Sequence, residues 1–195
     1  MSRRLRKLPL ALPAVLAVLA VSACGDGHTR VTTGTYAGES GANAPYLSVG
    51  PLEYEVQLSR QLNPYNSEDA RYLQGLTPEQ LKLEPGQEWF AVFMQVYNNK
   101  HEPYTASNSF TITDTQGNSY SPIVPGETNP FAYRGGTVPA NSQLPAPGTT
   151  AADDPAQGLV LLYKIQVVSL DNRPLELKIV SPENPSESAS AELDV

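Results

Sequence analysis

The segment Trp89-Phe90-Ala91-Val92-Phe93-Met94-Gln95-Val96-Tyr97 decides the fold class of this chain. In an extended strand successive side chains point to opposite faces, so the aromatic residues Trp89, Phe93 and Tyr97 share one side and the even-numbered apolar residues share the other. A strand that is apolar on both sides is typical of the middle of a sheet whose two faces are covered. We therefore predict a central strand here, with the core of the domain around it.

Other segments show the periods of further strands. Residues 159–168 are again apolar on both faces, and Leu52, Tyr54, Val56 and Leu58 alternate with polar residues, which predicts a strand with one buried face. Alternation also predicts strands at 175–179 and at 189–195, the latter an edge strand with outward charges. The pieces 110–113 and 119–120, separated by a turn that contains Gly117, predict a hairpin.

These segments amount to about seven strands joined by turns, which is typical of an all-β, immunoglobulin-like two-sheet sandwich without a cysteine pair. A closed barrel is the alternative fold. We expect Trp89 to fill the space between the two sheets. A short helical turn is predicted at Thr77-Pro78-Glu79-Gln80, where Thr77 and Gln80 have the spacing of a capping box.

The connection from Ser121 to Gly158 is rich in proline and lacks a sustained period. Long connections inside compact domains tend to be functional or poorly ordered. This one contains Phe131, Tyr133 and Arg134, and Phe, Tyr and Arg side chains often anchor protein contacts. We name these three residues as a possible partner contact. The alternative is that Phe131 and Tyr133 fill the open end of the sandwich.

The N-terminal segment has the pattern of an export signal. Four positive charges, Arg3, Arg4, Arg6 and Lys7, precede an apolar stretch from Leu8 to Val21. That stretch is shorter than the roughly 18 to 20 residues with which a helix crosses a bilayer. Residues 1–23 are therefore predicted to be a signal peptide.

The signal ends in Val21-Ser22-Ala23-Cys24, which resembles the lipobox of bacterial lipoproteins. The resemblance implies that Cys24 receives a diacylglycerol and becomes the first mature residue, and two acyl chains would give a durable anchor. An ordinary signal peptide that ends near a cysteine is the alternative. Cys24 is the only cysteine, which excludes an intrachain disulfide and a several-cysteine zinc site.

The mature chain is predicted to divide into a flexible tether, 24–50, and a sandwich domain, 51–195. The tether is rich in Gly, Ser, Thr, Ala and Asn and poor in large apolar side chains. Loss of the signal leaves nine Lys and Arg against 20 Asp and Glu, a formal net charge of −11. Such a surface repels phosphates, so nucleic acid is not an expected partner and the lipid must anchor the chain to the membrane.

The order of the central pieces resembles a known family. Val96-Tyr97-Asn98-Asn99 ends a strand, Phe110-Thr111-Ile112-Thr113-Asp114 follows, and Tyr120-Ser121-Pro122 comes after a Gly turn. This order is similar to immunoglobulin-like domains of unknown function in Gram-positive lipoproteins, which resemble a small secreted mycobacterial antigen. The resemblance covers roughly residues 88–180 and departs in the Pro-rich connection. It implies fold and location, and it implies no catalytic residues.

The sequence contains no evident catalytic or cofactor motif. His28 lies in the predicted tether and His101 in a polar turn, where a solvated side chain is the ordinary interpretation. The acid pairs Glu68-Asp69 and Asp153-Asp154 lack the spacing of a calcium loop. We therefore expect no metal, no cofactor and no enzyme.

The leading hypothesis is a lipid-anchored, extracytoplasmic, non-catalytic module of the cell envelope that binds an envelope protein or a small ligand. The alternatives are a carboxylate-dependent envelope hydrolase and a structural spacer.

Overall fold

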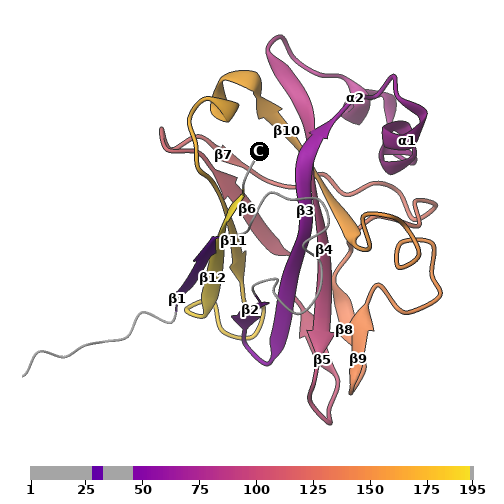
Figure 1. Ribbon diagram of the computed structural model, residues 1–195, viewed down its shortest axis with the longest axis vertical. Helices are drawn as coiled ribbons and strands as arrows, with labels where there is room; N and C mark the ends of the chain where they lie inside the picture. Colours follow the sequence, from indigo (N-terminus) through magenta and orange to yellow (C-terminus); the bar gives the residue numbers. More distant parts are fainter. Residues whose placement is uncertain (1–27, 33–45, 194–195) are drawn as a thin grey trace, which may run out of the picture.

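The computed structural model describes residues 28–32 and 46–193, which form a mostly-β domain (Figure 1). Its strands are β1 (His28–Thr32), β2 (Tyr46–Val49), β3 (Leu52–Leu62), β4 (Gln87–Asn98), β5 (Tyr104–Ala106), β6 (Ser109–Thr113), β7 (Ser119–Tyr120), β8 (Gly136–Val138), β9 (Ser142–Leu144), β10 (Leu159–Gln166), β11 (Leu175–Val180) and β12 (Ser188–Leu193). Its helices are α1 (Ser67–Ala70), η1 (Arg71–Leu73), α2 (Pro78–Leu81) and η2 (Val167–Leu170). Among the described residues no helix is long and apolar enough to cross a bilayer.

The strands form two main sheets that face one another as the layers of a β-sandwich (Figure 1). The first sheet has the order β1-β12-β11-β6-β7, and the second has the order β10-β4-β3-β2 with β9 paired to the end of β4. Strands β5 and β8 form a small third sheet. Every pairing is antiparallel except that of β1 with β12.

Strand β4 is central, as predicted. It pairs with β3 along one edge and with β10 along the other, and both of its faces are covered. The even-numbered side chains of β4, such as Phe90 and Met94, pack against Leu177 and Ile179 of the opposite sheet. Burial of these apolar surfaces between the layers is the main stabilising contribution to the sandwich.

The odd-numbered face of β4 forms a second core, outside the sandwich. Trp89, Phe93 and Leu162 pack there against Tyr72 of η1 and Phe131 of the long connection. The prediction that Trp89 lies between the sheets is therefore wrong. Trp89 points away from the opposite sheet because it shares a side of β4 with Ala91 and Phe93, and the segments around η1 and residue 131 cover that side.

A β-bulge in β3 divides that strand into two parts of opposite phase. Val56 pairs with Met94 and Leu58 with Phe93, so Gln57 is an extra residue without its own partner. Val56 consequently packs in the inter-sheet core, whereas Leu58 packs against the outer core. The predicted single buried face from Leu52 to Leu58 is correct only as far as Val56.

The prediction that residues 24–50 form a flexible tether is wrong for two segments, because each of them forms a strand. Residues 28–32 form β1, which pairs with β12 along the edge that the sequence left exposed, and residues 46–49 form β2, which pairs with β3. In β2, Leu47 and Val49 are buried while Tyr46 and Ser48 are exposed, so even this short segment has one core face. The remainder of the tether and the signal peptide with Cys24 lie outside the described residues.

The seven predicted strands are all present, and the five additional strands, β1, β2, β5, β8 and β9, have three to five residues each. The hairpin of β6 and β7 and the capping box of α2 are confirmed. The long connection is built into the fold, because it supplies β8 and β9 and forms bridges from Ile123 and Ala132 to β10.

Candidate functional site: a polar face on the second sheet

The bulge in β3 also divides the outer face of the second sheet into an apolar half and a polar half. Beyond the bulge the outward side chains belong to the covered outer core. Before it, Glu55 lies opposite Tyr46 of β2 and Gln95 of β4, while their chain neighbours Leu47, Tyr54 and Val96 point into the inter-sheet core. We call the resulting outward-pointing group the polar face; its residues are Tyr46, Glu53, Glu55, Gln57, Gln95 and Tyr97.

Glu55 is the buried centre of the polar face. Glu55 is only 1% exposed. The Tyr97 hydroxyl donates a hydrogen bond of 2.8 Å to Glu55 Oε2. Burial, followed by the hydrogen bond to Glu55 and its negative charge, raises the pKa of Tyr97 well above its usual range. Tyr97 is therefore a neutral donor at physiological pH.

Two further oxygens in this group have no hydrogen-bond donor among the described residues. They are Glu55 Oε1 and Gln57 Oε1, and both are shielded from solvent. Buried acceptors are nearly always satisfied in folded proteins, because an unpaired one costs about 1 to 3 kcal/mol. The two unpaired oxygens of Glu55 and Gln57 therefore need a physical explanation.

The exposed part of the polar face is aromatic. Tyr46 is 45% exposed and its ring meets that of Tyr97 edge to face, with centroids 5.6 Å apart. Burial and the charges of Glu55 and Glu53 raise the pKa of Tyr46, which keeps its hydroxyl protonated. At the rim, Asn99 donates a 3.0 Å hydrogen bond to Glu53. An accessible ring thus lies beside polar groups on a rigid sheet.

The residues named from sequence as a partner contact lie elsewhere. Phe131 and Tyr133 are 5% and 3% exposed, and the Tyr133 hydroxyl donates to the carbonyl of Ser107. The guanidinium of Arg134 donates to the backbone carbonyls of residues 125, 126, 129 and 132. These side chains therefore have structural contacts, but Phe131 and Tyr133 do not jointly fill the open end of the sandwich, because Phe131 packs in the outer core and Tyr133 in the core between the sheets.

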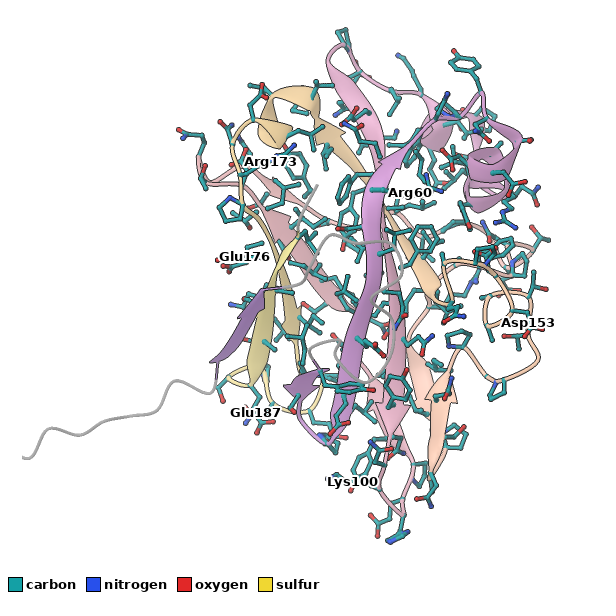
Figure 2. The ribbon with its side chains drawn as sticks, in the orientation of Figure 1. Arg60, Lys100, Asp153, Arg173, Glu176 and Glu187 are labelled. Atoms are coloured by element: carbon teal, nitrogen blue, oxygen red, sulfur yellow. The ribbon has the colours of Figure 1, made fainter. Side chains whose placement is uncertain are left out.

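The acidic pairs and the histidine considered from the sequence form no metal-binding group among the described residues. Asp69 forms an ion pair of 2.6 Å with Arg60, which lies on the part of β3 near α1 (Figure 2), and Asp154 forms one of 2.6 Å with Arg71. Across the described ranges no three His, Cys, Asp or Glu side chains are grouped as metal ligands would be. His101 is exposed, and its nearest recorded polar contact is the Asn141 amide at 3.5 Å.

No family model matches this chain, and no curated protein matches it. Several solved structures are similar in fold. They include a candidate lipoprotein of Bacillus subtilis, ycdA (14% identity, TM-score 0.47, covering 76% of this chain and 38% of that one), an uncharacterized β-sandwich protein of Clostridium difficile (13%, 0.46, 86% and 95%) and the yjhA protein of Bacillus subtilis (9%, 0.46, 85% and 99%).

The chain thus spans well under half the length of the first of these proteins. The fold itself defines a mostly-β protein, and the Clostridium difficile protein to which it is similar is an uncharacterized β-sandwich protein.

Proposed function

We propose that this protein is a lipid-anchored, extracytoplasmic module of the cell envelope with an immunoglobulin-like sandwich, and that it binds its partner without catalysis through the polar face. The single observation that carries the binding role is the placement of Tyr46, a large exposed ring supported by Tyr97 above buried Glu55. Tyrosine combines apolar area with a polar tip and is enriched at contact surfaces.

The strand order supports the immunoglobulin-like assignment. Immunoglobulin domains place their third, sixth and seventh strands in one sheet and the first, second and fifth in the other. In this chain β6, β11 and β12 are neighbours in the first sheet, and β3, β4 and β10 are neighbours in the second. If β3 is taken as the first strand and the short strands β5, β8 and β9 are left out of the count, these six strands correspond. The fourth strand, β7, instead pairs with β6 in the first sheet.

The state of three of the four buried acids among the described residues supports a non-catalytic role, Glu55 of the polar face being the fourth. Asp69 and Asp154 are paired with arginines, and Asp114 accepts hydrogen bonds from the adjoining turn and from the η2 region. A general acid or base needs free access to substrate, and these carboxylates are committed to holding segments of the fold together.

We predict that a photo-crosslinking amino acid at position 46 captures a discrete envelope component in intact cells. The matched control is position 178, because Lys178 is exposed on the outer face of β11 in the opposite sheet. Adducts formed at 46 and absent at 178, analysed by mass spectrometry, would support the polar face. Equal labelling at both positions, or none at 46, would contradict it and favour a spacer role.

We also predict that the anchor depends on Cys24. The native chain should carry a diacylglyceryl mass and fractionate with membranes, and Cys24→Ala should lose both properties, because one thiol provides the only attachment point. Intact mass and membrane fractionation measure these outcomes. A native chain that is unmodified and free of membranes would overturn the anchoring proposal and leave the binding proposal to the crosslinking result.

The position of β1 adds a geometric consequence. Cys24 precedes His28, the first residue of β1, by four residues, and an extended chain covers at most about 3.3 to 3.6 Å per residue. A lipid on Cys24 would therefore hold the first residue of β1 within about 15 Å of the membrane surface. The spacing between domain and membrane is then short.

A further inference from the structure

The buried part of the polar face contains acceptor oxygens that have no donor. Tyr97 Oη lies within hydrogen-bonding distance of Glu55 Oε2 and of Gln95 Oε1, yet a phenol has one proton to donate. Glu55 Oε1 and Gln57 Oε1 have no donor at all among the described residues. Of these four acceptor atoms, two therefore share the single Tyr97 proton and two have no donor.

The orientation of the Gln95 amide is fixed by its other neighbour. Gln95 Nε2 donates to the carbonyl oxygen of Gln157. If the amide were turned over, Gln95 Oε1 would face that carbonyl and two acceptors would oppose each other. Gln95 Oε1 must therefore face Tyr97, and the excess of acceptors remains.

The backbone conformation around Gln157 places its carbonyl oxygen next to the Gln95 amide. Gln157 has φ of 49°, a left-handed conformation that is uncommon for residues other than glycine. The next residue, Gly158, lies so close to β4 that an added Cβ would come within 2.7 Å of Met94 N. The turn before β10 is thus pressed against β4, and its carbonyl reaches the Gln95 amide of the polar face.

We infer that the cluster of Glu55, Gln57, Gln95, Tyr97 and the Gln157 carbonyl binds a small hard cation of the calcium class. Such cations take several oxygen ligands from carboxylates, amide side chains and backbone carbonyls, so one ion can satisfy acceptors that a single added proton on Glu55 cannot. Glu55 supplies the buried negative charge. The inference deepens the proposed binding face, although the ion site itself needs neither the lipid anchor nor a partner.

The test is calorimetric titration of the purified full chain in detergent with CaCl2, at ionic strength held constant with NaCl. Because most ligands are neutral, we expect saturable binding with Kd of about 10⁻⁴ to 10⁻³ M. Glu55→Gln should weaken binding about tenfold or more, and Gln57→Glu, which adds a carboxylate, should tighten it about tenfold. Glu102→Gln, at an exposed position, should match the native chain.

Circular dichroism first establishes that each variant is folded. If Glu55→Gln does not fold, the gain in affinity in Gln57→Glu still decides the question, because a purely hydrogen-bonded network would give no such gain. Absence of saturable binding to the native chain, or equal binding by all folded variants, would overturn the inference. Crosslinking at position 46 is scored separately, so failure of the ion site is distinguishable from failure of the binding face.

Discussion

Replacing Asp154 with alanine is expected to lower the free energy of unfolding by about 2 to 3 kcal/mol, because the buried Tyr72 hydroxyl loses a charged acceptor and Arg71 loses its nearest counter-charge. Asp154 is 5% exposed, receives a 2.8 Å hydrogen bond from the Tyr72 hydroxyl and forms a 2.6 Å ion pair with Arg71. The guanidinium of Arg71 also lies over the rings of Tyr72 and Phe131. Loss of the carboxylate would therefore leave Arg71 with only the exposed Glu68, at 3.5 Å, as a counter-charge.

The neighbouring acid provides a matched control. Asp153 is exposed on the outer part of the long connection (Figure 2), so Asp153→Ala should change stability by less than about 0.5 kcal/mol. Urea unfolding of both variants measures the difference. Because an apolar pair often replaces a buried ion pair without loss, Arg71→Met with Asp154→Leu should recover much of the stability. A double variant as unstable as Asp154→Ala would contradict the ion-pair explanation.

The sequence predicted those strands whose own pattern of apolar and polar residues identifies them. The two-sided apolar pattern of residues 89–97 correctly placed β4 in the middle of a covered sheet, and simple alternation identified β11 and β12. The same alternation could not reveal β1 or β5, because short strands of mixed polarity are formed by pairing with a neighbour whose position depends on the whole fold.

The candidate site was missed for a related reason. The alternation of residues 52–58 predicts that Glu53 and Glu55 lie on the solvent-exposed face of an amphipathic strand. The sequence near Gln57 gives no sign that this residue forms a bulge, and the sequence near Gln157 gives no sign that this turn packs on β4. Phe131 and Tyr133 were chosen because aromatic residues in a long loop suggest a contact surface. Phe131 proved to be buried because the loop packs on the apolar half of the outer face of the sheet, and Tyr133 proved to be buried in the core between the sheets.

Asp114 closes the hairpin of β6 and β7 and ties it to the segment after β10. Its Oδ1 accepts hydrogen bonds from the backbone amides of Gln116 and Asn118, each at 2.9 Å. Its Oδ2 accepts from the side chains of Asn118, Ser169 and Asn172 at 2.8, 2.7 and 3.3 Å. Burial alone would raise the pKa of Asp114, but these donors outweigh burial and hold it well below its usual range.

Asp114→Ala is expected to lower the free energy of unfolding by about 2 to 3 kcal/mol at pH 7, because several donors lose a charged acceptor together. The folded-state pKa is depressed, so the carboxylate stabilises the fold at pH values above its unfolded pKa of about 3.9, and this contribution is lost as pH falls below that value. Urea unfolding at pH 7 and at about pH 3 should therefore show a smaller difference between native chain and variant at the lower pH. Asp171→Ala, which alters an exposed acid of the same region, should change stability by less than about 0.5 kcal/mol at pH 7. A loss of stability in Asp114→Ala that stayed constant between the two pH values would mean that the carboxylate acts through packing and not through its charge.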